Sequence, residues 1–308
     1  MDILSTYHMT LIVLAAAFGL FMAWGIGAND VANAMGTSVG SKALTIKQAI
    51  IVAMIFEFAG AYLAGGEVTS TIRKGIIDSS YYTHVPELLV FGMIGALLAA
   101  GTCLLIASWA GWPVSTTHSI IGAIVGFSAV GVGVESVKWG AVVGIVGSWV
   151  ITPLIAGVIA YFVFLSAQKL IFDAENPLRM AVRYVPFYMG ITGLMISLVT
   201  IKKGLKHVGI DLSNNEGYIL AVAIGVVVGI IGRILIARLK FDEKADKTSH
   251  YVNVEKVFGI LMIVTACSMA FAHGSNDVAN AIGPVAAVVS VVQSGGVISP
   301  KAQLVWWV

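Results

Sequence analysis

The chain contains little charge and little cysteine. Only 11% of its 308 residues are charged, whereas soluble domains usually carry about a quarter. The net charge of +2 is too small to predict binding to nucleic acid. The two cysteines, Cys103 and Cys267, lie in separate apolar runs, so we expect small core residues rather than a disulfide framework or a metal site. These scarcities exclude an ordinary soluble domain and a disulfide-rich secreted one.

Apolar residues are abundant instead, at 58% of the chain. A helix that crosses a bilayer needs about 20 consecutive, predominantly apolar residues. The sequence therefore predicts an all-α polytopic membrane protein in contact with membrane lipid. We expect spans at 9–28, 46–66, 88–110, 139–166, 186–201, 217–237 and 256–275, and a polar loop at 65–87. Two further apolar segments, 113–131 and 278–295, are rich in glycine and small residues, and each is either a full span or a re-entrant hairpin.

One nine-residue stretch occurs twice in the chain. Residues 28–36 and 275–283 agree at seven of nine positions, with a constant offset of 247. Each copy lies where an apolar run turns polar, and carboxylate and amide groups inside a bilayer are costly unless they find partners. Placing the same costly group twice indicates a two-fold ion-binding site, as many secondary transporters have.

The distribution of positive charge predicts how the two copies are oriented. Residues 1–8 lack Lys and Arg, so the N-terminus is expected outside and the basic linker near residue 240 inside. The two copies would then enter the membrane from opposite sides, which defines inverted-topology repeats. We divide the chain into a first transmembrane half (1–237), a charged linker (238–255) and the start of a second inverted repeat (256–308). We expect the remainder of this second repeat to lie beyond residue 308.

The first copy carries groups that suit a hard cation. Gly25 and Gly27 are expected to break the helix and free backbone carbonyls near Ala28. Those carbonyls, the Asp30 carboxylate and the asparagine oxygens are the oxygen ligands that hard cations prefer. Asn29 and Asn33 are four residues apart and share a helix face. The competing interpretation is that these polar groups only hold packed helices together.

A second motif, Trp112-Pro-Val-Ser-Thr-Thr-His-Ser119, lies between charge-free segments. Pro113 is expected to interrupt a helix, and Ser or Thr directly before an apolar run marks a new helix start. Hydroxyls gathered at a helix N-terminus, with its free N–H groups, form an anion site, and phosphate or sulfate would fit. The alternative is an ordinary N-cap without a ligand.

Three ionisable residues inside apolar segments are harder to assign. Glu57 lies within a span, where a carboxylate has a function or pairs within the bundle. His118 donates to an anion or to a neighbouring side chain, and the second role is favoured. His273 stands where the first copy has Ile26, so it breaks the symmetry of the repeat, and it is assigned no role.

The two copies at 27–34 and 274–281, together with Pro113-Val-Ser-Thr-Thr-His118, resemble the inorganic phosphate transporter (PiT) family, which includes related sulfate carriers. The resemblance implies a sodium- or proton-driven symporter with inverted repeats, broken helices or re-entrant hairpins, and often a dimer. It also implies that Asn29, Asp30, Asn276 and Asp277 bind the coupling cation, and Ser115, Thr116 and Thr117 bind phosphate. To these we add Ala28 for the cation, Asn33 and Asn280 for phosphate, and Glu57 and Ser275 in support. The family's second Pro-Val-Ser-Thr-Thr-His element would fall near residue 360, at the same offset of 247.

The predicted function is a secondary active symporter of the cell membrane, a homodimer that imports phosphate with Na⁺ by alternating access. Na⁺ is the only metal expected, and no cofactor is expected. The alternative is a proton-coupled phosphate or sulfate transporter. A rival of another class is an intramembrane hydrolase that uses Ser115 or Ser119 with His118, but neither of these serines lies in a Gly-x-Ser-x-Gly element. A channel is a further rival, and the absence of a Walker-type loop argues against ATP drive.

Overall fold

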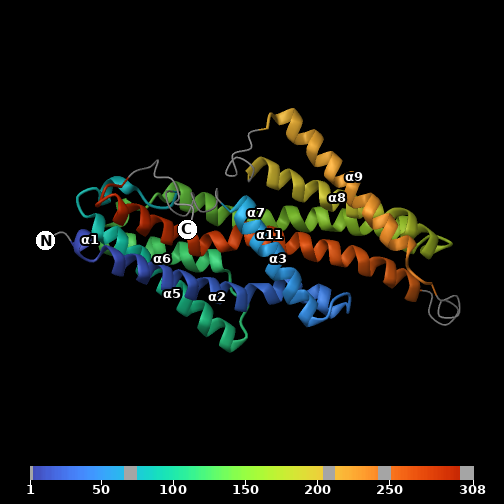
Figure 1. Cartoon of the computed structure of the whole chain (residues 1–308), viewed down its shortest axis with the longest axis horizontal. Coiled ribbons are helices and arrows are strands. Elements are labelled where there is room, and N and C mark those ends of the chain that lie inside the picture. Colours follow the sequence, from blue (N-terminus) through green and yellow to red (C-terminus); the bar gives the residue numbers. More distant parts are fainter. Residues whose placement is uncertain (1–2, 66–74, 204–211, 242–250, 299–308) are drawn as a thin grey trace. The chain divides into compact units, whose positions relative to one another are not determined.

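The structure is a computed structural model that describes residues 3–65, 75–203, 212–241 and 251–298. This part of the chain is almost entirely helical (Figure 1). Within it, seven helices are long and apolar enough to cross a membrane. They are α2 (His8–Gly40), α3 (Ile46–Ala64), α5 (Pro86–Ala110), α7 (Trp139–Ala167) with the π-helical turn η3 (Gln168–Phe172), α8 (Pro177–Lys203), α9 (Asn214–Ala237) and α11 (Val252–Gln293). The expectation of an all-α polytopic membrane protein is confirmed.

The helices pack into two compact units. The first takes in Met1–Ala34, Ala59–Ile145 and His273–Val308, and the second takes in Met35–Phe58 and Val146–Ala272. Both α2 and α11 contribute residues to both units. This division reflects packing, so the proposed repeat boundary after residue 237 stays a prediction. Parts of two predicted segments, 66–74 of the polar loop and 242–250 of the linker, lie outside the described residues.

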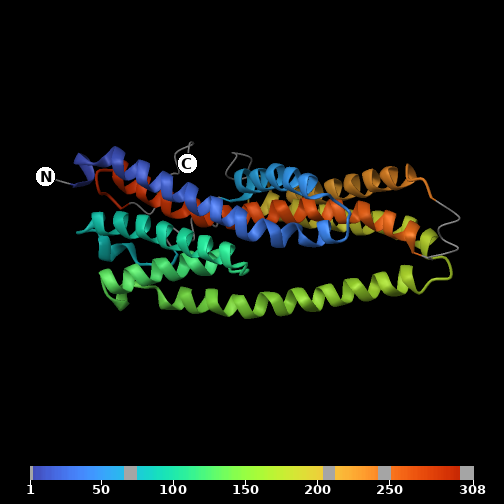
Figure 2. The same ribbon diagram turned by 90° about the horizontal axis from the view of Figure 1, so that it is seen from below.

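In the first unit, α5 and α6 (Thr116–Gly131) pack side by side (Figures 1 and 2). Helix α5 ends at Ala110, and Gly111 follows in the left-handed conformation with φ of 70°. Ser115 then caps α6, because its hydroxyl accepts the His118 N–H at 3.3 Å. The predicted interruption at Pro113 is confirmed. With 16 residues, α6 is about 24 Å long, which is shorter than the ~30 Å hydrocarbon core and favours the re-entrant interpretation of 113–131.

Helix α2 runs without a break from His8 to Gly40. The expectation that Gly25 and Gly27 interrupt it was wrong. At Gly25 the missing side chain serves packing, because a Cβ there would lie 2.9 Å from Cβ of Leu104 in α5. In a continuous helix each carbonyl accepts an N–H four residues later, so the freed carbonyl that was expected near Ala28 is not formed.

Helix α11 is likewise continuous over 42 residues, from Val252 to Gln293. The predicted span 256–275 and the segment 278–295 are therefore parts of one helix, and the expectation of two separate elements was wrong. Pro284 lies inside this helix. The small residues around the second motif do not break the helix, because a helical glycine costs only about 1 kcal/mol, which packing readily offsets.

The end of the predicted polar loop packs into the first unit through Tyr82. The short helix η1 (Ser79–Tyr82) is capped by the Asp78 carboxylate, which accepts the Ser80 N–H at 3.0 Å. The Tyr82 side chain is fully buried and donates to the Ser128 hydroxyl at 2.7 Å. Burial raises the pKa of the Tyr82 hydroxyl, so it remains a donor at neutral pH. The segment thus anchors the far end of α6.

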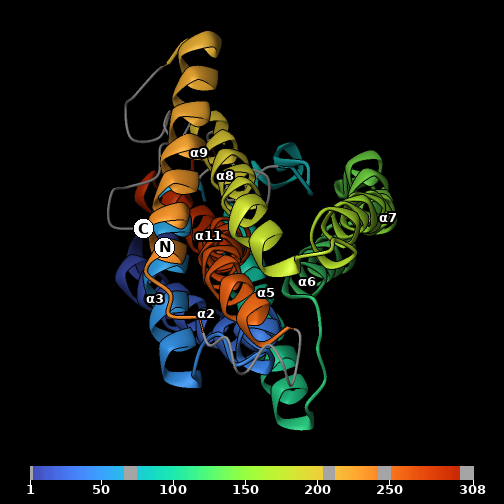
Figure 3. The same cartoon turned by 90° about the vertical axis from the view of Figure 1, so that its right-hand side faces the viewer.

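In the second unit, α8 and α9 lie side by side (Figure 3). Their backbones approach closely, because a Cβ at Gly225 would lie 2.9 Å from the Gly190 carbonyl oxygen. Such contacts between small residues are the usual means of packing helices in membranes.

The cysteines of the chain are both free; Cys267 is half-buried, but Cys103 is exposed, so the assignment of Cys103 to the core was wrong.

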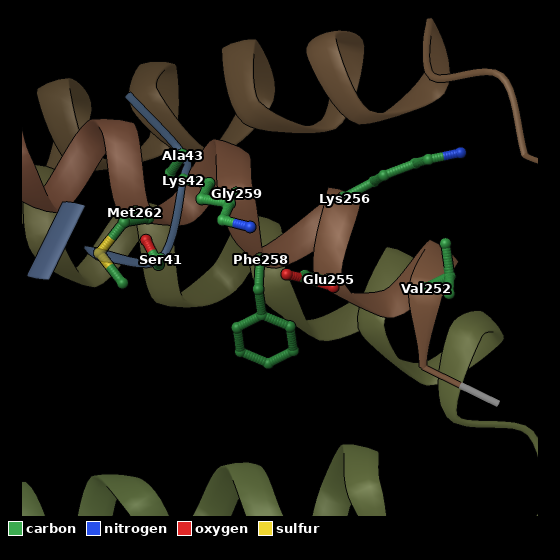
Figure 4. A pocket seen from close by; sticks show the side chains of 9 residues that line it. All are labelled: Ser41, Lys42, Ala43, Val252, Glu255, Lys256, Phe258, Gly259 and Met262. Atoms are coloured by element: carbon green, nitrogen blue, oxygen red, sulfur yellow. The ribbon is translucent and has the colours of Figure 1, made fainter. Parts of the chain in front are cut away.

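A hollow of about 370 Å³ also lies in the second unit (Figure 4). It is lined by the turn after α2 and the first turns of α11: Ser41, Lys42, Ala43, Val252, Glu255, Lys256, Phe258, Gly259 and Met262. Lys42 has a positive φ of 61°, which the tight turn between α2 and α3 requires. None of the predicted site residues lines this hollow.

Candidate functional site

The two Asn-Asp motifs meet within the first unit, one from α2 and one from α11. One oxygen of Asp30, one of Asp277 and the Nε2 atom of His273 all lie within 4.8 Å of one another. His273 Nε2 is 3.2 Å from Asp277 Oδ2 and 3.8 Å from Asp30 Oδ2, and each of the three side chains is less than a fifth exposed. Two like charges in so small and so buried a space repel unless positive charge or protons lie between them.

The other oxygen of Asp277 faces the start of α6. Thr116 and Thr117 donate their hydroxyls to Asp277 Oδ1 at 3.5 and 3.4 Å. The amides of Asn276 and Asn280 donate to the same oxygen at 3.1 and 3.3 Å. The predicted phosphate-binding hydroxyls therefore share a carboxylate with the second Asn-Asp motif, so the predicted anion and cation sites adjoin.

Asn280 is fully buried and has one polar atom left over. Its Nδ2 donates to the hydroxyls of Thr116 and Thr117 at 3.4 and 3.0 Å, in addition to Asp277. Since a carboxylate only accepts hydrogen bonds, the amide nitrogen must face Asp277. The Asn280 Oδ1 atom then has no hydrogen-bond partner among the described residues. A buried acceptor without a partner costs about 1–3 kcal/mol, and a bound cation or donor would remove that cost.

Asn29 has a different position from the one its motif suggested. Its Nδ2 donates to the Trp112 carbonyl at 3.0 Å and to the Ser108 hydroxyl at 3.3 Å. Its Oδ1 accepts the Val114 N–H at 3.2 Å. These bonds hold the non-helical segment between α5 and α6 against α2, as the packing interpretation of the motif requires. The cation role of Asn29 stays a prediction.

This geometry gives a test of Asn29. Asn29→Ala should lower stability by about 2–4 kcal/mol, because the Trp112 carbonyl and the Val114 N–H lose their partner. We expect the apparent melting temperature of the purified protein in detergent to fall by several degrees. Asn33→Ala is the matched control, since Asn33 is exposed and donates to the Asn29 carbonyl of its own helix at 3.3 Å. Equal melting temperatures of the two variants would contradict the holding role.

The remaining predicted residues occupy varied positions. Ser115 and Asn276 are exposed beside the site, and Ala28 and Asn33 are exposed on α2. Ser275 is buried in α11. Glu57 is half-buried on α3, in the second unit, so its supporting role stays a prediction.

Sequence reasoning missed His273. A signal was available, because His273 stands four residues before Asp277 and residues at that spacing are neighbours on a helix face. A histidine at this spacing from a membrane-buried aspartate is expected to contact the carboxylate. The symmetry argument, which compared His273 only with Ile26, gave it too little weight.

The oxygen atoms of this site fit a hard cation. The carboxylates of Asp30 and Asp277 lie close together, and Asp277 also contacts the hydroxyls of α6 and the amide of Asn280. Oxygen ligands suit hard cations such as Na⁺, whereas thiolate and imidazole favour transition metals, and the imidazole of His273 is the nitrogen group in this cluster. This geometry does not favour a hydrolase. A serine nucleophile needs a side-chain base to take its proton, whereas the Ser115 hydroxyl accepts the backbone N–H of His118 as a helix cap.

The sequence profile of the phosphate transporter family matches residues 26–308. The chain belongs to the phosphate transporter family. This multi-pass membrane transporter is 54% identical to a "Putative phosphate permease" of Haemophilus influenzae, over all of the chain and 73% of that protein. It is 43% identical to a protein of similar name from Pyrococcus abyssi, over 92% of the chain and 68% of the relative.

A solved structure described as "The sodium-dependent phosphate transporter" also resembles this transporter. The TM-score is 0.86 at 39% sequence identity, over 97% of the chain and 72% of the solved one. These relatives are transporters and permeases and not enzymes. The expectation of a transporter is thus confirmed over the hydrolase.

Proposed function

We propose that this transporter is a secondary active symporter that imports inorganic phosphate together with Na⁺ by alternating access. The observation that carries the proposal is the approach of Asp30 and Asp277 to within 4.8 Å beside the hydroxyls of α6. Phosphate would be repelled by this carboxylate pair unless cations are bound first. The sodium dependence named for the solved relative supports sodium as that cation.

Each group has a role in this proposal. Ser115, Thr116 and Thr117 bind phosphate with the free N–H groups at the start of α6. Asp30 and Asp277 bind Na⁺, with Asn276 and the free oxygen of Asn280. The amide nitrogen of Asn280 joins the two sites by holding both threonine hydroxyls. This moves Asn280 from a phosphate ligand toward a cation ligand, because an acceptor atom suits a cation and repels phosphate oxygens.

Coupling follows from charge. Phosphate carries about one to two negative charges at neutral pH, and moving each inward against a negative interior costs ~2.3 kcal/mol per 100 mV. Two or more Na⁺ ions bound with it offset or reverse that cost.

As part of the same proposal, the N-terminus faces outside and two copies form a dimer in the cell membrane. Impermeant labelling of a cysteine introduced at Ser5 and chemical cross-linking check these two points.

The direct test is phosphate uptake into proteoliposomes. An inward Na⁺ gradient should accelerate uptake of labelled phosphate at least tenfold over an equal K⁺ gradient, because only Na⁺ relieves the repulsion at the carboxylates. A proton gradient imposed at equal Na⁺ should have little effect. Uptake that follows the proton gradient and ignores Na⁺ would establish the proton-coupled alternative in its place.

A further inference from the structure

We infer that the hollow between the turn after α2 and the start of α11 binds the headgroup of a membrane phospholipid, and that this lipid is phosphatidylethanolamine. The hollow has a volume of about 370 Å³, which lies within the ~300–1,000 Å³ typical of sites for small molecules. Its lining residues all belong to the second unit. The inference therefore goes beyond the proposed transport of phosphate and does not depend on it.

The charged residues of the hollow mark the ends of two apolar spans. Residues 31–41 contain no Asp, Glu, Lys or Arg, and Lys42 is the first charged residue after them. Residues 257–272 of α11 contain none either, and Glu255 and Lys256 directly precede them. Charged side chains at the end of a span are expected at the level of the lipid headgroups, because the hydrocarbon core excludes them. The hollow is therefore at the depth where a phospholipid presents its phosphate.

The apolar part of the lining suits the glycerol and the first carbons of the acyl chains. Val252, Phe258 and Met262 supply apolar side chains to the hollow, and each of them is half-buried. Gly259 lies among them, and a Cβ at this glycine would meet no atom within 4 Å, so the space beside it is open. A lipid can thus lay apolar groups against α11 while its headgroup stays among the charged residues.

The charged part of the lining contains groups of both signs. In Figure 4 the side chains of Lys42 and Glu255 point toward one another. No hydrogen bond or ion pair joins either side chain to another residue in the part of the chain that the structure describes. The hollow therefore offers one ammonium and one carboxylate that are both available to a ligand.

A phosphoethanolamine headgroup complements both charges. Its phosphate is a partner for the Lys42 ammonium, and its own primary ammonium can donate hydrogen bonds to the Glu255 carboxylate. The quaternary ammonium of phosphatidylcholine has no N–H to donate. Phosphatidylglycerol and free phosphate carry no cation at all, so either would leave Glu255 unpaired beside an anion, which is unfavourable. Charge complementarity therefore favours phosphatidylethanolamine over these three ligands.

Lys256 provides a second positive group at the edge of the hollow. Its side chain lines the hollow, and its ammonium donates to Asn253 Oδ1 at 3.3 Å and to the Lys240 carbonyl at 3.5 Å. An ammonium has three N–H donors, so one of them is left for a phosphate oxygen. Basic pockets between transmembrane helices are known to bind lipid headgroups through such groups. A lipid held in this way would join the turn after α2 to the first turns of α11 and stabilise the second unit.

The test measures binding of three lipids with identical acyl chains to the whole chain in detergent. The lipids are phosphatidylethanolamine, phosphatidylcholine and phosphatidylglycerol. Thermal stabilisation plotted against lipid concentration gives an apparent Kd for each of them. Wild type should bind phosphatidylethanolamine about fivefold more tightly than either of the others, the upper range for an ion pair near a protein surface.

Two variants separate the contributions of the two charges. Lys42→Asn should weaken the binding of phosphatidylethanolamine and of phosphatidylglycerol about fivefold each, because both lose a basic partner for the phosphate. Asparagine tolerates the positive φ of 61° at this position. Glu255→Gln should lower the affinity for phosphatidylethanolamine to that for phosphatidylcholine, and phosphatidylglycerol should bind at least as tightly as before. The matched control is Lys47→Asn, at an exposed lysine of α3 that does not line the hollow, and it should change none of the three Kd values.

Four results would overturn the inference. They are equal affinities of wild type for the three lipids, an unchanged preference for phosphatidylethanolamine in Glu255→Gln, unchanged binding in Lys42→Asn, or an equal loss in Lys47→Asn, which would indicate only a general effect of surface charge. Inorganic phosphate that stabilises wild type but not Lys42→Asn would assign the hollow to the free anion and overturn the inference as well. Should Lys42→Asn fail to fold, Lys256→Gln replaces it, with the same expected weakening for both lipids.

Discussion

Asp30→Asn should abolish sodium-driven phosphate uptake while the protein remains folded. Asparagine has the shape of aspartate and removes only the charge, so the packing of α2 is preserved. A hydrogen bond or contact with a charged group contributes about 1.5–3 kcal/mol, and each 1.36 kcal/mol corresponds to a factor of ten. Initial uptake at limiting Na⁺ should therefore fall about 100-fold, measured with labelled phosphate in proteoliposomes.

The control for Asp30→Asn is Glu175→Gln, which removes the charge of an exposed carboxylate in the turn before α8. It should transport as wild type does. A melting temperature of Asp30→Asn within a few degrees of wild type would show that the loss is functional. Wild-type uptake with wild-type Na⁺ dependence in this variant would contradict the role of Asp30, and with it the idea that the carboxylate pair traps the coupling ion.

The sequence predicted the parts of this structure that depend on which groups can be placed in the hydrocarbon of a membrane. Seven charge-poor runs correspond to seven membrane-length helices, because polar backbone in lipid leaves few alternatives to a long helix. The meeting of Asp30 and Asp277 was also predictable, since burying a carboxylate twice is costly unless the two copies share one site. Pro113 was a reliable break, because proline lacks an N–H and its ring obstructs the preceding turn.

The parts that the sequence did not predict depend on tertiary neighbours. Gly25 could equally free a carbonyl or admit another helix, and only the approach of Leu104 decides between them. Asn29 could bind a cation or hold a loop, and only the positions of Trp112 and Val114 show that it holds the loop, while its cation role stays a prediction. His273 was undervalued because a repeat invites a search for matching residues, whereas here the residue that does not match lies at the centre of the site.

The double variant Thr116→Val/Thr117→Val should lower the apparent affinity for phosphate by at least about 100-fold, since each 1.36 kcal/mol corresponds to a factor of ten. Valine has nearly the shape of threonine without the hydroxyl, so two charge-assisted donors are lost at about 1.5–3 kcal/mol each when both act. The change should appear in KM for phosphate, at saturating Na⁺, with the maximal rate less affected. Ser119→Ala is the control. The Ser119 hydroxyl donates to the Ser115 carbonyl at 3.0 Å, and removing this hydroxyl leaves the backbone of the first turn of α6 intact.

The Na⁺ dependence of the same double variant separates two explanations for these hydroxyls. Both threonines donate to Asp277 and both accept from Asn280, so they touch the cation ligands as well as the proposed phosphate position. If they bind phosphate, KM for phosphate rises while the half-saturating Na⁺ stays near its wild-type value. If instead they only orient Asp277, the half-saturating Na⁺ rises and KM for phosphate is unchanged at saturating Na⁺. An unchanged KM would therefore reassign Thr116 and Thr117 from the anion to the cation and leave Ser115 and the N–H groups of α6 as the phosphate ligands.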